Sequence, residues 1–573
     1  FQMHFVKKVP TTDAENELKA KEQAKKLKQF VFVRDKVFGK RVYKEYDNEL
    51  LTLTEGILSR NPDIYTFWNI RREVLDDMKG RQERGEAVDV EALYTHELTL
   101  CETCITANPK SYSAWFQRGW VLKRMASPDL KKELKLCELA LSIDCRNFHC
   151  WDHRRIVAAM AGLTAEDELN FSQKLVSANF SNFSAWHMRM HLLPRIKDER
   201  GEMILSEEVA MKEVERVANA IFTDPADQSA WMFARWLIDI YSPSSFLNGE
   251  SSCANVPLVV SLLNNREVTL SMTRPSSSSY AQQFIKTTKP VQWDPICIRG
   301  GAVCRVWRCT VEEGDTVEAS LDGNEFSSFP ASNVIYSSHL IDRLVKGGKS
   351  TVIESIRDHC EQLLQEEKDN SFAVHTLTQC LRALSPLESH ASIISHLSQL
   401  ATSLDPLRRN MYSCFLSQER IRKTLMSEES ESTKTVLQSL LDGNERLSLK
   451  YLQLIDISFL DFLAPVIRQL DLRGNDLSEV QFVSTLPLVD SLTLDENPME
   501  ELPSSLSSLN RLEYLSIGAC KLFSSSPQSV SSLLNSLPSL KRFLYCETSL
   551  VESTEELRSL LSNESIRLIP YYL

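Results

Sequence analysis

Asn61–Leu75 reads NPDIYTFWNIRREVL, and Asn108–Leu122 reads NPKSYSAWFQRGWVL. Each segment begins with Asn and Pro, and an aromatic residue, a Trp and an Arg then follow at intervals of three residues. Asn followed by Pro favours a helix start, because the Asn side chain can accept from free N–H groups and Pro fits the first turn. Residues three apart lie on one face of a helix. Both segments therefore predict a helix that buries its Trp.

The same pattern returns in RNFHCWDHRRIVA, NFSNFSAWHMRMHLLP and DPADQSAWMFARWL, which begin at Arg146, Asn179 and Asp224. The five tryptophans lie 47, 36, 35 and 45 residues apart, a spacing typical of stacked helical hairpins. We expect each Arg to bind carbonyls or a carboxylate where two repeats meet. In the last copy the Arg is displaced by one residue, to Arg235. The predicted core anchors are Trp68, Trp115, Trp151, Trp186 and Trp231.

The helical pattern, which we assign to residues 1–242, is interrupted after Trp236. Residues 243–345 contain short β-type runs such as PLVVSLL, separated by Ser-, Gly- and Pro-rich turns, and this predicts an inserted Ig-like β-sandwich. Helical periodicity resumes weakly over residues 346–440, where a sixth Trp is missing. Over residues 441–573 the spacing changes to L-x-x-L-x-L-x-x-N, which is typical of leucine-rich repeats.

Four copies of the leucine pattern share one polar ladder position. Asn475, Asn497, Cys520 and Thr548 occupy it, and they are separated by 22, 23 and 28 residues. The alternating leucines predict short strands, and the Asn side chains are expected to bind backbone groups where the chain turns away. We therefore expect about four repeats in a small C-terminal domain.

Composition narrows the class of protein. The chain has 573 residues, with 65 Lys and Arg against 77 Asp and Glu, and its net charge of −12 argues against nucleic-acid binding. No apolar run approaches the roughly 20 residues of a membrane span. The 14 cysteines are scattered, as in a reduced cytoplasmic protein. We expect a soluble, cytoplasmic, multidomain protein with no nucleic-acid partner and no transmembrane segment.

The chain shows no zinc-ligand spacing. Cys101-x-x-Cys104 lacks a second pair, so we interpret it as a buried structural pair. His187 and His191 are four residues apart on a predicted helix but lack the acidic partner of a zinc-hydrolase motif, and we interpret them as structural. We expect no metal site within this chain.

The five phrases, in register, resemble the repeats of protein prenyltransferase α subunits. The order of the domains is helical repeats, then a sandwich insert, then leucine-rich repeats. This order resembles that of the α subunits of metazoan Rab geranylgeranyl transferases. The resemblance implies an α-α helical-hairpin solenoid that forms one half of a heterodimeric, zinc-dependent enzyme. Such an enzyme moves geranylgeranyl from its diphosphate to C-terminal cysteine thiols of Rab GTPases, which an escort protein presents. In this family the zinc and the lipid pocket belong to the β subunit, so this chain alone is expected to bind no cofactor.

The resemblance also implies site residues. NPKSYSAW matches the family motif at the subunit junction, which assigns Lys110 and Tyr112 to the vicinity of the geranylgeranyl diphosphate. RNFHCW likewise assigns Asn147 and His149. Positioned cations and donors stabilise the charge that develops on a leaving diphosphate, so Lys110, Tyr112 and His149 are the expected catalytic residues. Tyr112 also occupies the recurring aromatic position, which packing alone explains almost as well.

Two further features concern how far the family pattern applies to this chain. The family often has His-His after the Trp of the second repeat, whereas this chain has Phe116 and Gln117, which puts any role of these two positions in doubt. If Met3 is the initiator, His4 is the second residue, and a flexible arm could bring its imidazole to the partner's zinc. A tail without that role is the alternative.

Two other functions are consistent with parts of the sequence. A non-catalytic adaptor would use the helical and leucine-rich repeats only to bind proteins, but it would not require Lys and His in the NPKSY and NFHCW phrases. The α subunit of a farnesyl or type I geranylgeranyl transferase would share the helical repeats, but the two added domains argue against it.

Overall fold

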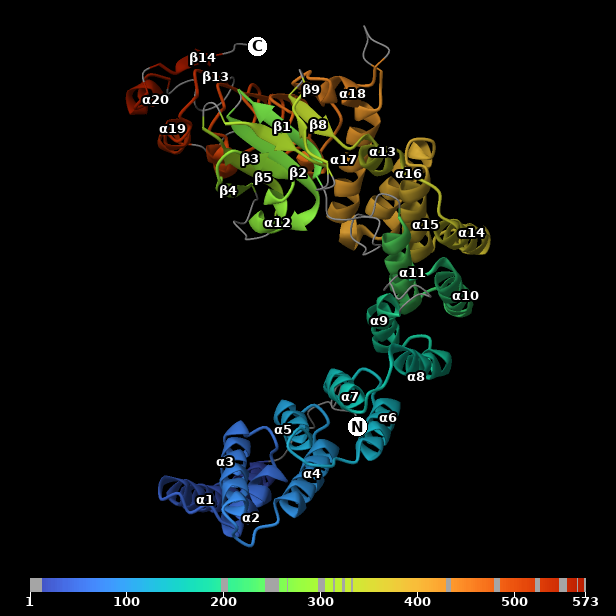
Figure 1. The fold of residues 1–573 in the computed structure, drawn as a ribbon, viewed down its shortest axis with the longest axis vertical. Helices are drawn as coiled ribbons and strands as arrows, with labels where there is room; N and C mark the ends of the chain where they lie inside the picture. The colour runs from blue at the N-terminus through green and yellow to red at the C-terminus, as the bar shows by residue number, and fades with distance from the viewer. Residues whose placement is uncertain are drawn as a thin grey trace. The chain divides into compact units, whose positions relative to one another are not determined.

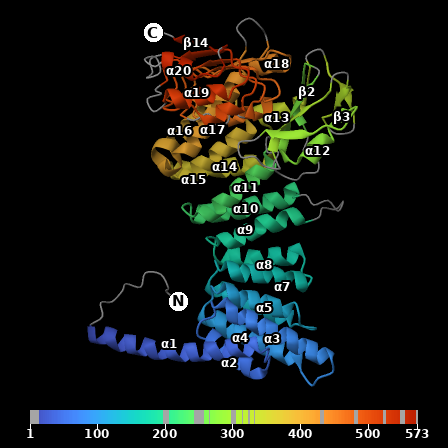
Figure 2. The ribbon, with the colours of Figure 1, turned by 90° about the vertical axis from the view of Figure 1, so that its left-hand side faces the viewer.

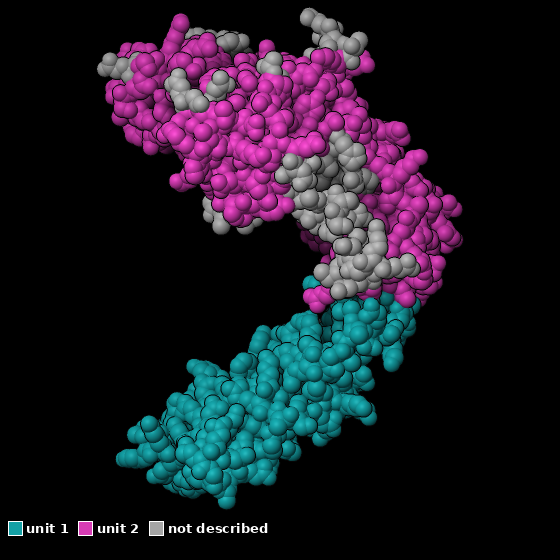
Figure 3. Space-filling view, viewed as in Figure 1, with its two compact units in different colours: residues 1–192 teal, residues 193–573 magenta. Residues whose placement is uncertain are grey.

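The chain divides into two compact units, residues 1–192 and residues 193–573 (Figure 3). Among the described residues, no helix is long and apolar enough to cross a membrane. The computed structural model describes residues 13–196, 205–242, 257–264, 266–296, 304–312, 315–321, 325–330, 333–428, 434–478, 485–520, 526–545, 554–563 and 565–570.

The first unit is built from α-helices in antiparallel pairs (Figures 1 and 2). After a long leading helix, a first and a second helix alternate along the chain, which confirms the predicted solenoid of helical hairpins. The helices are α1 (Asp13–Val42), α2 (Asn48–Leu58), α3 (Tyr65–Glu83), α4 (Val90–Ala107), α5 (Tyr112–Leu122), α6 (Leu130–Ile143), α7 (Phe148–Met160), α8 (Ala165–Ala178) and α9 (Phe183–Leu192).

The Trp of each repeat lies on the second helix and points into the interior. All five are at most 5% exposed. Each indole N–H donates to the backbone carbonyl six residues earlier, at 2.8–3.0 Å. The ring therefore fills the space between helices while its one polar edge ties the preceding turn to the helix.

A buried Arg three residues after the Trp joins one repeat to the next. Each Arg contacts a Glu on the first helix of the following repeat, with shortest N–O distances of 2.5–2.7 Å. Arg71 and Arg118 also donate to backbone carbonyls of the first helix of their own repeat. The guanidinium groups of Arg71 and Arg118 are thus satisfied from both sides, whereas Nη1 of Arg154 is buried without a hydrogen-bond partner. The three pairs are Arg71–Glu97, Arg118–Glu133 and Arg154–Glu168.

The Asx residue that opens the pattern does not cap the second helix, and that prediction is wrong. It ends the preceding helix, and its side-chain oxygen accepts from the N–H two residues later. This Asx turn satisfies the side chain before the helix starts. The N-caps follow three residues later, at Ser111, Asn147 and Asp227. The Asx-turn residues are Asn108, Asp144, Asn179 and Asp224.

The second unit begins with one further hairpin, and after the insert the helices resume. Although the sixth Trp is missing, Asn370 caps the second helix of the resumed pair and donates from Nδ2 to the Pro225 carbonyl at 3.0 Å. The helices are α10 (Glu207–Thr223), α11 (Gln228–Tyr241), α13 (Ser338–Lys346), α14 (Thr351–Glu366), α15 (Ser371–Leu384), α16 (His390–Gln399), η2 (Leu400–Leu404), η3 (Pro406–Arg408), α17 (Arg409–Leu425) and α18 (Val436–Leu441).

The insert contains two antiparallel sheets. One has five strands in the order β4-β5-β2-β1-β8, and the other has three in the order β3-β6-β7. Six consecutive residues of β1 are buried, because both faces of its sheet are covered. The elements are β1 (Pro257–Leu263), β2 (Glu267–Ser276), α12 (Ser278–Gln282), β3 (Ile285–Thr287), β4 (Trp293–Ile296), β5 (Cys304–Thr310), β6 (Val317–Ala319), β7 (Ser327–Ser328) and β8 (Val334–Tyr336).

The leucine-periodic segment forms a sheet of six parallel strands in sequence order. Asn475 accepts from two N–H groups and donates to carbonyls at 2.8 Å. The first and last strands lie outside the four predicted copies, and the first has Leu452 at the ladder position. The elements are β9 (Arg446–Ser448), η4 (Ser458–Leu463), β10 (Gln469–Asp471), β11 (Ser491–Thr493), η6 (Ser504–Ser508), β12 (Tyr514–Ser516), α19 (Pro527–Asn535), β13 (Arg542–Tyr545), α20 (Thr554–Leu560) and β14 (Arg567–Pro570). Thr548 lies outside the described residues.

The insert and the parallel strands share one hydrophobic core. Leu258 and Val306 of the five-stranded sheet belong to the same buried cluster as Leu447 and Phe462 of the C-terminal segment. The Ser271 hydroxyl donates to the Phe462 carbonyl at 2.8 Å. The other face of the five-stranded sheet packs into a separate core inside the insert. The insert is therefore built into the second unit rather than attached by a linker.

Candidate functional site

Lys110, Tyr112, Phe148 and His149, called the α5–α7 edge below, lie at the starts of two neighbouring second helices. α5 begins at Tyr112 and α7 begins at Phe148, and the two helices pack against each other. Lys110 lies two residues before α5, in the Asx turn of Asn108. The sequence-predicted residues are thus brought together, although 39 positions separate Lys110 from His149.

Asn147 holds the two helix starts together. Its Oδ1 accepts from the backbone N–H groups of His149 and Cys150 at 3.1 and 3.3 Å, which caps α7. Its Nδ2 donates to the Pro109 carbonyl at 3.0 Å, immediately before Lys110. Both ends of the amide are therefore engaged within the chain, and Asn147 is a positioning residue.

His149 is the buried member of the edge. It is 6% exposed, and its ring lies 4.2 Å from the Tyr112 ring, centroid to centroid, at an interplanar angle of 80°. Burial lowers the pKa of the imidazole below its ordinary 6.5, an effect that Asp152 and a hydrogen bond with the Lys110 backbone only partly offset. The lowered pKa favours the neutral form of the imidazole at pH 7.

Lys110 supplies the positive charge of the edge. Its side chain is exposed, and within the described part of the chain its ammonium group forms no ion pair. Backbone N–H groups at the starts of α5 and α7 add a favourable environment for an anion. The edge therefore offers an unpaired cation beside a phenol and a neutral imidazole.

The recurring aromatic residue is exposed in three of the repeats, whereas Phe183 of the fourth is half-buried. Tyr65, Tyr112 and Phe148 are 67%, 70% and 52% exposed. The Tyr112 ring contacts the His149 ring, yet most of its surface stays exposed. Three residues correspond to about 300° around a helix, so this position is turned about 60° away from the buried Trp. Arg72 lies over the ring of the equally exposed Phe116, 5.2 Å from its centroid.

The remaining sequence candidates lie apart from this edge. Cys101 and Cys104 are buried and unbridged, and burial raises the pKa of the Cys104 thiol to about 12. The His187 and His191 rings are 4.5 Å apart. Over the described ranges, no group of three or more His, Cys, Asp or Glu side chains is placed to hold a metal ion. His4 lies outside the described residues.

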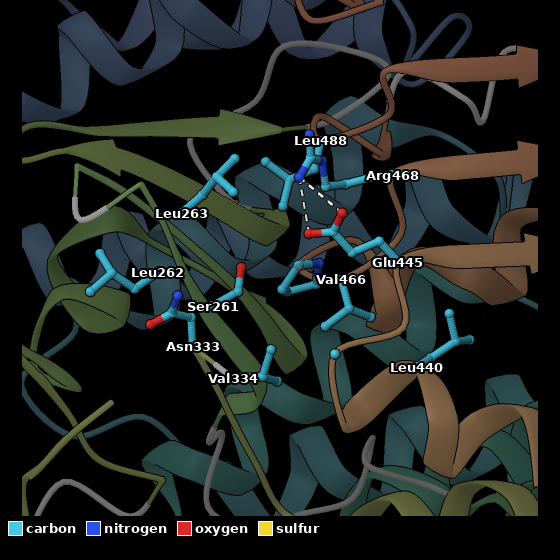
Figure 4. A pocket seen from close by; sticks show the side chains of 12 residues that line it. Ser261, Leu262, Leu263, Asn333, Val334, Leu440, Glu445, Val466, Arg468 and Leu488 are labelled. Atoms are coloured by element: carbon cyan, nitrogen blue, oxygen red, sulfur yellow. Dashed lines mark hydrogen bonds and ion pairs between the residues drawn. The ribbon is translucent and has the colours of Figure 1, made fainter. Parts of the chain in front are cut away.

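A small cavity of about 80 Å³ lies at the seam between the insert and the parallel strands (Figure 4). Figure 4 shows Ser261 and Leu263 on its insert side and the Glu445–Arg468 ion pair on the other. Arg468 also binds Asp490 at 2.7 Å, so its charge is already compensated. The cavity shares no residue with the α5–α7 edge.

The protein prenyltransferase alpha subunit repeat family matches residues 94–125, 130–161, 165–196 and 210–241. Each match spans a first and a second helix, from α4–α5 to α10–α11. The copy at Asn61–Leu75 lies outside these ranges but makes the same Trp and Arg contacts.

Full-length relatives extend the similarity beyond the repeats. The geranylgeranyl transferase type-2 subunit alpha of Homo sapiens is 32% identical over 583 residues, which covers 96% of this chain and 92% of that protein. The Mus musculus protein of the same name is 31% identical over 595 residues, with the same coverage. The Dictyostelium discoideum protein is 37% identical over 243 residues, or 41% of this chain and 75% of that protein. Among solved structures, Candida albicans protein geranylgeranyltransferase-I complexed with GGPP covers 66% of this chain at 16% identity, with a TM-score of 0.39.

Proposed function

The chain belongs to the family of geranylgeranyl transferase type-2 alpha subunits, and we propose that its α5–α7 edge stabilises the leaving diphosphate during geranylgeranyl transfer to Rab GTPases. In this reaction the C–O bond to the diphosphate breaks and a C–S bond to a cysteine forms, while the thiol loses its proton. Negative charge grows on the diphosphate as the C–O bond lengthens. A cation already positioned there stabilises the transition state more than the bound substrate.

One observation carries this proposal: Lys110, which forms no ion pair in the described part of the chain, lies just before α5, and its backbone is hydrogen-bonded to His149, whose pKa is lowered. Lys110 provides charge, and the Tyr112 hydroxyl and the neutral His149 imidazole provide donors. Asn147 keeps the loop before Lys110 attached to the start of α7. The exposed aromatic positions Tyr65 and Tyr112 suit a surface that a partner subunit covers.

The complete active site needs a second chain in this proposal. The β subunit supplies the zinc, which holds the acceptor thiol as a thiolate when bound, and it supplies the lipid pocket. Geranylgeranyl diphosphate then lies at the junction between the subunits. An escort protein presents the Rab GTPase, and the complex acts in the cytoplasm.

We also propose a domain type for the insert and for the C-terminal segment of the second unit. We infer an Ig-like β-sandwich for the insert, from its two antiparallel sheets around one core. We infer leucine-rich repeats for the C-terminal segment, from its parallel strands and from the Asn475 and Asn497 ladder.

Co-expression with a β subunit tests the function. We expect a stable heterodimer that transfers labelled geranylgeranyl from its diphosphate to a Rab GTPase only when escort protein is present. A chain that forms no heterodimer and supports no transfer would be an adaptor instead. Transfer of farnesyl to a short C-terminal Cys peptide without escort protein would indicate the farnesyl or type I class.

A further inference from the structure

One face of the six-stranded parallel sheet carries a row of polar side chains. In each strand the second residue is a buried leucine or phenylalanine, whereas the first residue is exposed or half-buried. Because successive side chains of a strand point to opposite faces, the first residues lie on the face away from the core. The strands pair in register, so these residues form one row across the sheet. The row consists of Arg446, Gln469, Ser491, Tyr514, Arg542 and Arg567.

Two arginines stand side by side at the end of this row. Arg542 of β13 and Arg567 of β14, called the arginine pair below, are direct partners in the register at the C-terminal edge of the sheet (Figure 1). Both are exposed, and neighbouring strands lie about 4.8 Å apart. Within the described part of the chain, neither guanidinium forms an ion pair or a hydrogen bond. Like charges at partner positions repel each other, so an anion bound between them would be stabilised.

The carboxylate nearest to the arginine pair is already bound. Glu513 forms an ion pair with Lys541 at 2.8 Å, and the charge of Arg542 is only a minor cause of its lowered pKa. The Arg542 guanidinium instead lies over the ring of Tyr514, 5.2 Å from its centroid. This contact holds the guanidinium over the sheet without neutralising it. The arginine pair therefore keeps its charge available to another molecule.

An apolar pair accompanies the arginine pair on the same face. Leu544 and Ile569 follow two residues later on β13 and β14, are again partners in the register, and are half-buried. Two residues along a strand correspond to about 6.6 Å. The face thus offers two cations beside an apolar patch, with the Tyr514 ring next to them. A free anion would use only the arginines, whereas a peptide with an acidic and an apolar side chain would use both pairs.

We propose that this face of the sheet is a docking surface for an acidic segment of a partner protein. An Asp or Glu carboxylate of that segment binds the arginine pair, and a neighbouring apolar side chain packs on Leu544 and Ile569. Arg binds carboxylates through two parallel hydrogen bonds, as Arg118 does with Glu133 in this chain. The excess of acidic residues in the chain argues against nucleic acid as the occupant. The inference does not depend on the proposed transferase function, because the α5–α7 edge lies in the other unit.

Selection of random dodecapeptides, displayed on phage, against the full chain tests this inference. We expect the enriched peptides to contain Asp or Glu close to an apolar residue. In fluorescence anisotropy, a synthetic copy of an enriched peptide should bind the double variant Arg542→Gln/Arg567→Gln at least about tenfold more weakly than the wild type. Replacing the acidic residue of the peptide by its amide should cause a similar loss with the wild-type chain and little further loss with the double variant.

Arg558→Gln is the matched control, because it removes an exposed Arg of α20 in the same domain and should leave peptide binding unchanged. The double variant should keep the wild-type melting temperature, and the amide peptide tests the inference on the unaltered chain in any case. If no peptide is enriched, or if the enriched peptides bind the double variant as well as the wild type, the inference is overturned. Phosphatidylserine vesicles that bind the wild type but not the double variant, with no peptide enriched, would assign a membrane surface instead.

Discussion

Lys110 is the residue on which the proposed chemistry depends most directly. Because its ammonium is exposed and unpaired in the described part of the chain, Lys110→Ala should leave folding intact. Loss of one positioned donor to a developing oxyanion typically costs about 10²-fold in turnover. We expect that loss in single-turnover geranylgeranyl transfer by the heterodimer. Lys131→Ala, an exposed lysine on α6, is the control and should keep the wild-type rate. A loss of less than about threefold, under 1 kcal/mol, would contradict the role.

Glu133 provides a pH-dependent contribution to stability. It binds Arg118 through both oxygens at 2.6 and 2.8 Å, and His153 Nε2 lies 3.2 Å away. Burial alone would raise the pKa of Glu133, but hydrogen bonds from His153 and Arg118 outweigh it and hold the pKa at about 2. Because this pKa is below the ordinary 4.5, the contribution is complete above pH 4.5 and is lost as the pH falls towards 2.

Glu133→Gln measures that contribution. At pH 7 the variant leaves Arg118 buried without its counter-charge, which should cost about 3–5 kcal/mol. The difference in urea midpoint between wild type and variant should therefore be largest at pH 7 and should shrink between pH 4.5 and 2. A difference that stays constant with pH would contradict the assignment. Glu166→Gln, an exposed carboxylate in the first turn of α8, is the control.

At the scale of elements, the start of α7 combines a cap with a link to α5. Asn147→Asp keeps an oxygen that can accept from the His149 and Cys150 N–H groups but loses the Nδ2 donor to the Pro109 carbonyl. Asn147→Ala loses both functions and should cost about 1 kcal/mol of stability through the cap. We expect Asn147→Asp to lower the transfer rate, by up to about 10²-fold, because a carboxylate oxygen then faces the Pro109 carbonyl and the loop that carries Lys110 is no longer held. An unchanged transfer rate in Asn147→Asp would mean that Asn147 acts only as the helix cap of α7.

The boundaries of the helices show which structural features the sequence patterns predict correctly. The spacing of aromatic, Trp and Arg correctly predicted the second helices, because three-residue intervals follow from the geometry of a single helix. The Asx-Pro signal was assigned the wrong role, since Asn108 forms a turn and Ser111 is the cap. Asn and Ser are both favoured as helix caps and in turns. Only the direction of the backbone after Pro109 shows which of the two residues is the cap.

At the scale of the whole molecule, the second unit depends on a core shared between the insert and the parallel strands. Leu258 lies in that shared core, whereas Phe284 lies in the separate core of the insert. Truncating either to Ala should cost about 2–5 kcal/mol. Leu258→Ala should raise hydrogen exchange in the insert and also in β9 and β10. Phe284→Ala should raise it in the insert alone, and equal effects on β9 and β10 would contradict the shared core.

The sequence by itself determined the repeats and indicated the residues to which we assign the chemistry. Each repeat has its aromatic residue, its Trp and its Arg on one helix, as around Trp68 and Trp115. Burial of each Trp therefore follows from the geometry of that helix. The motif around Lys110 was recognisable for the same reason, because it is a short contiguous phrase. The leucine period likewise indicated short strands, although the end strands β9 and β14 lacked the polar ladder residue that marks the others.

Only the tertiary structure decided which groups meet across repeats. Arg71 finds Glu97 26 positions away, Asn147 reaches Pro109 over 38 positions, and Ser271 reaches Phe462 over 191. The exposure of Tyr112 and the rotation of Arg235 away from the position of the paired Arg residues also belong to this level. Each depends on how one helix is rotated against its neighbours, because a turn of about 100° moves a side chain from a paired interior position to an open one. Spacing within a single helix carries no information about that rotation.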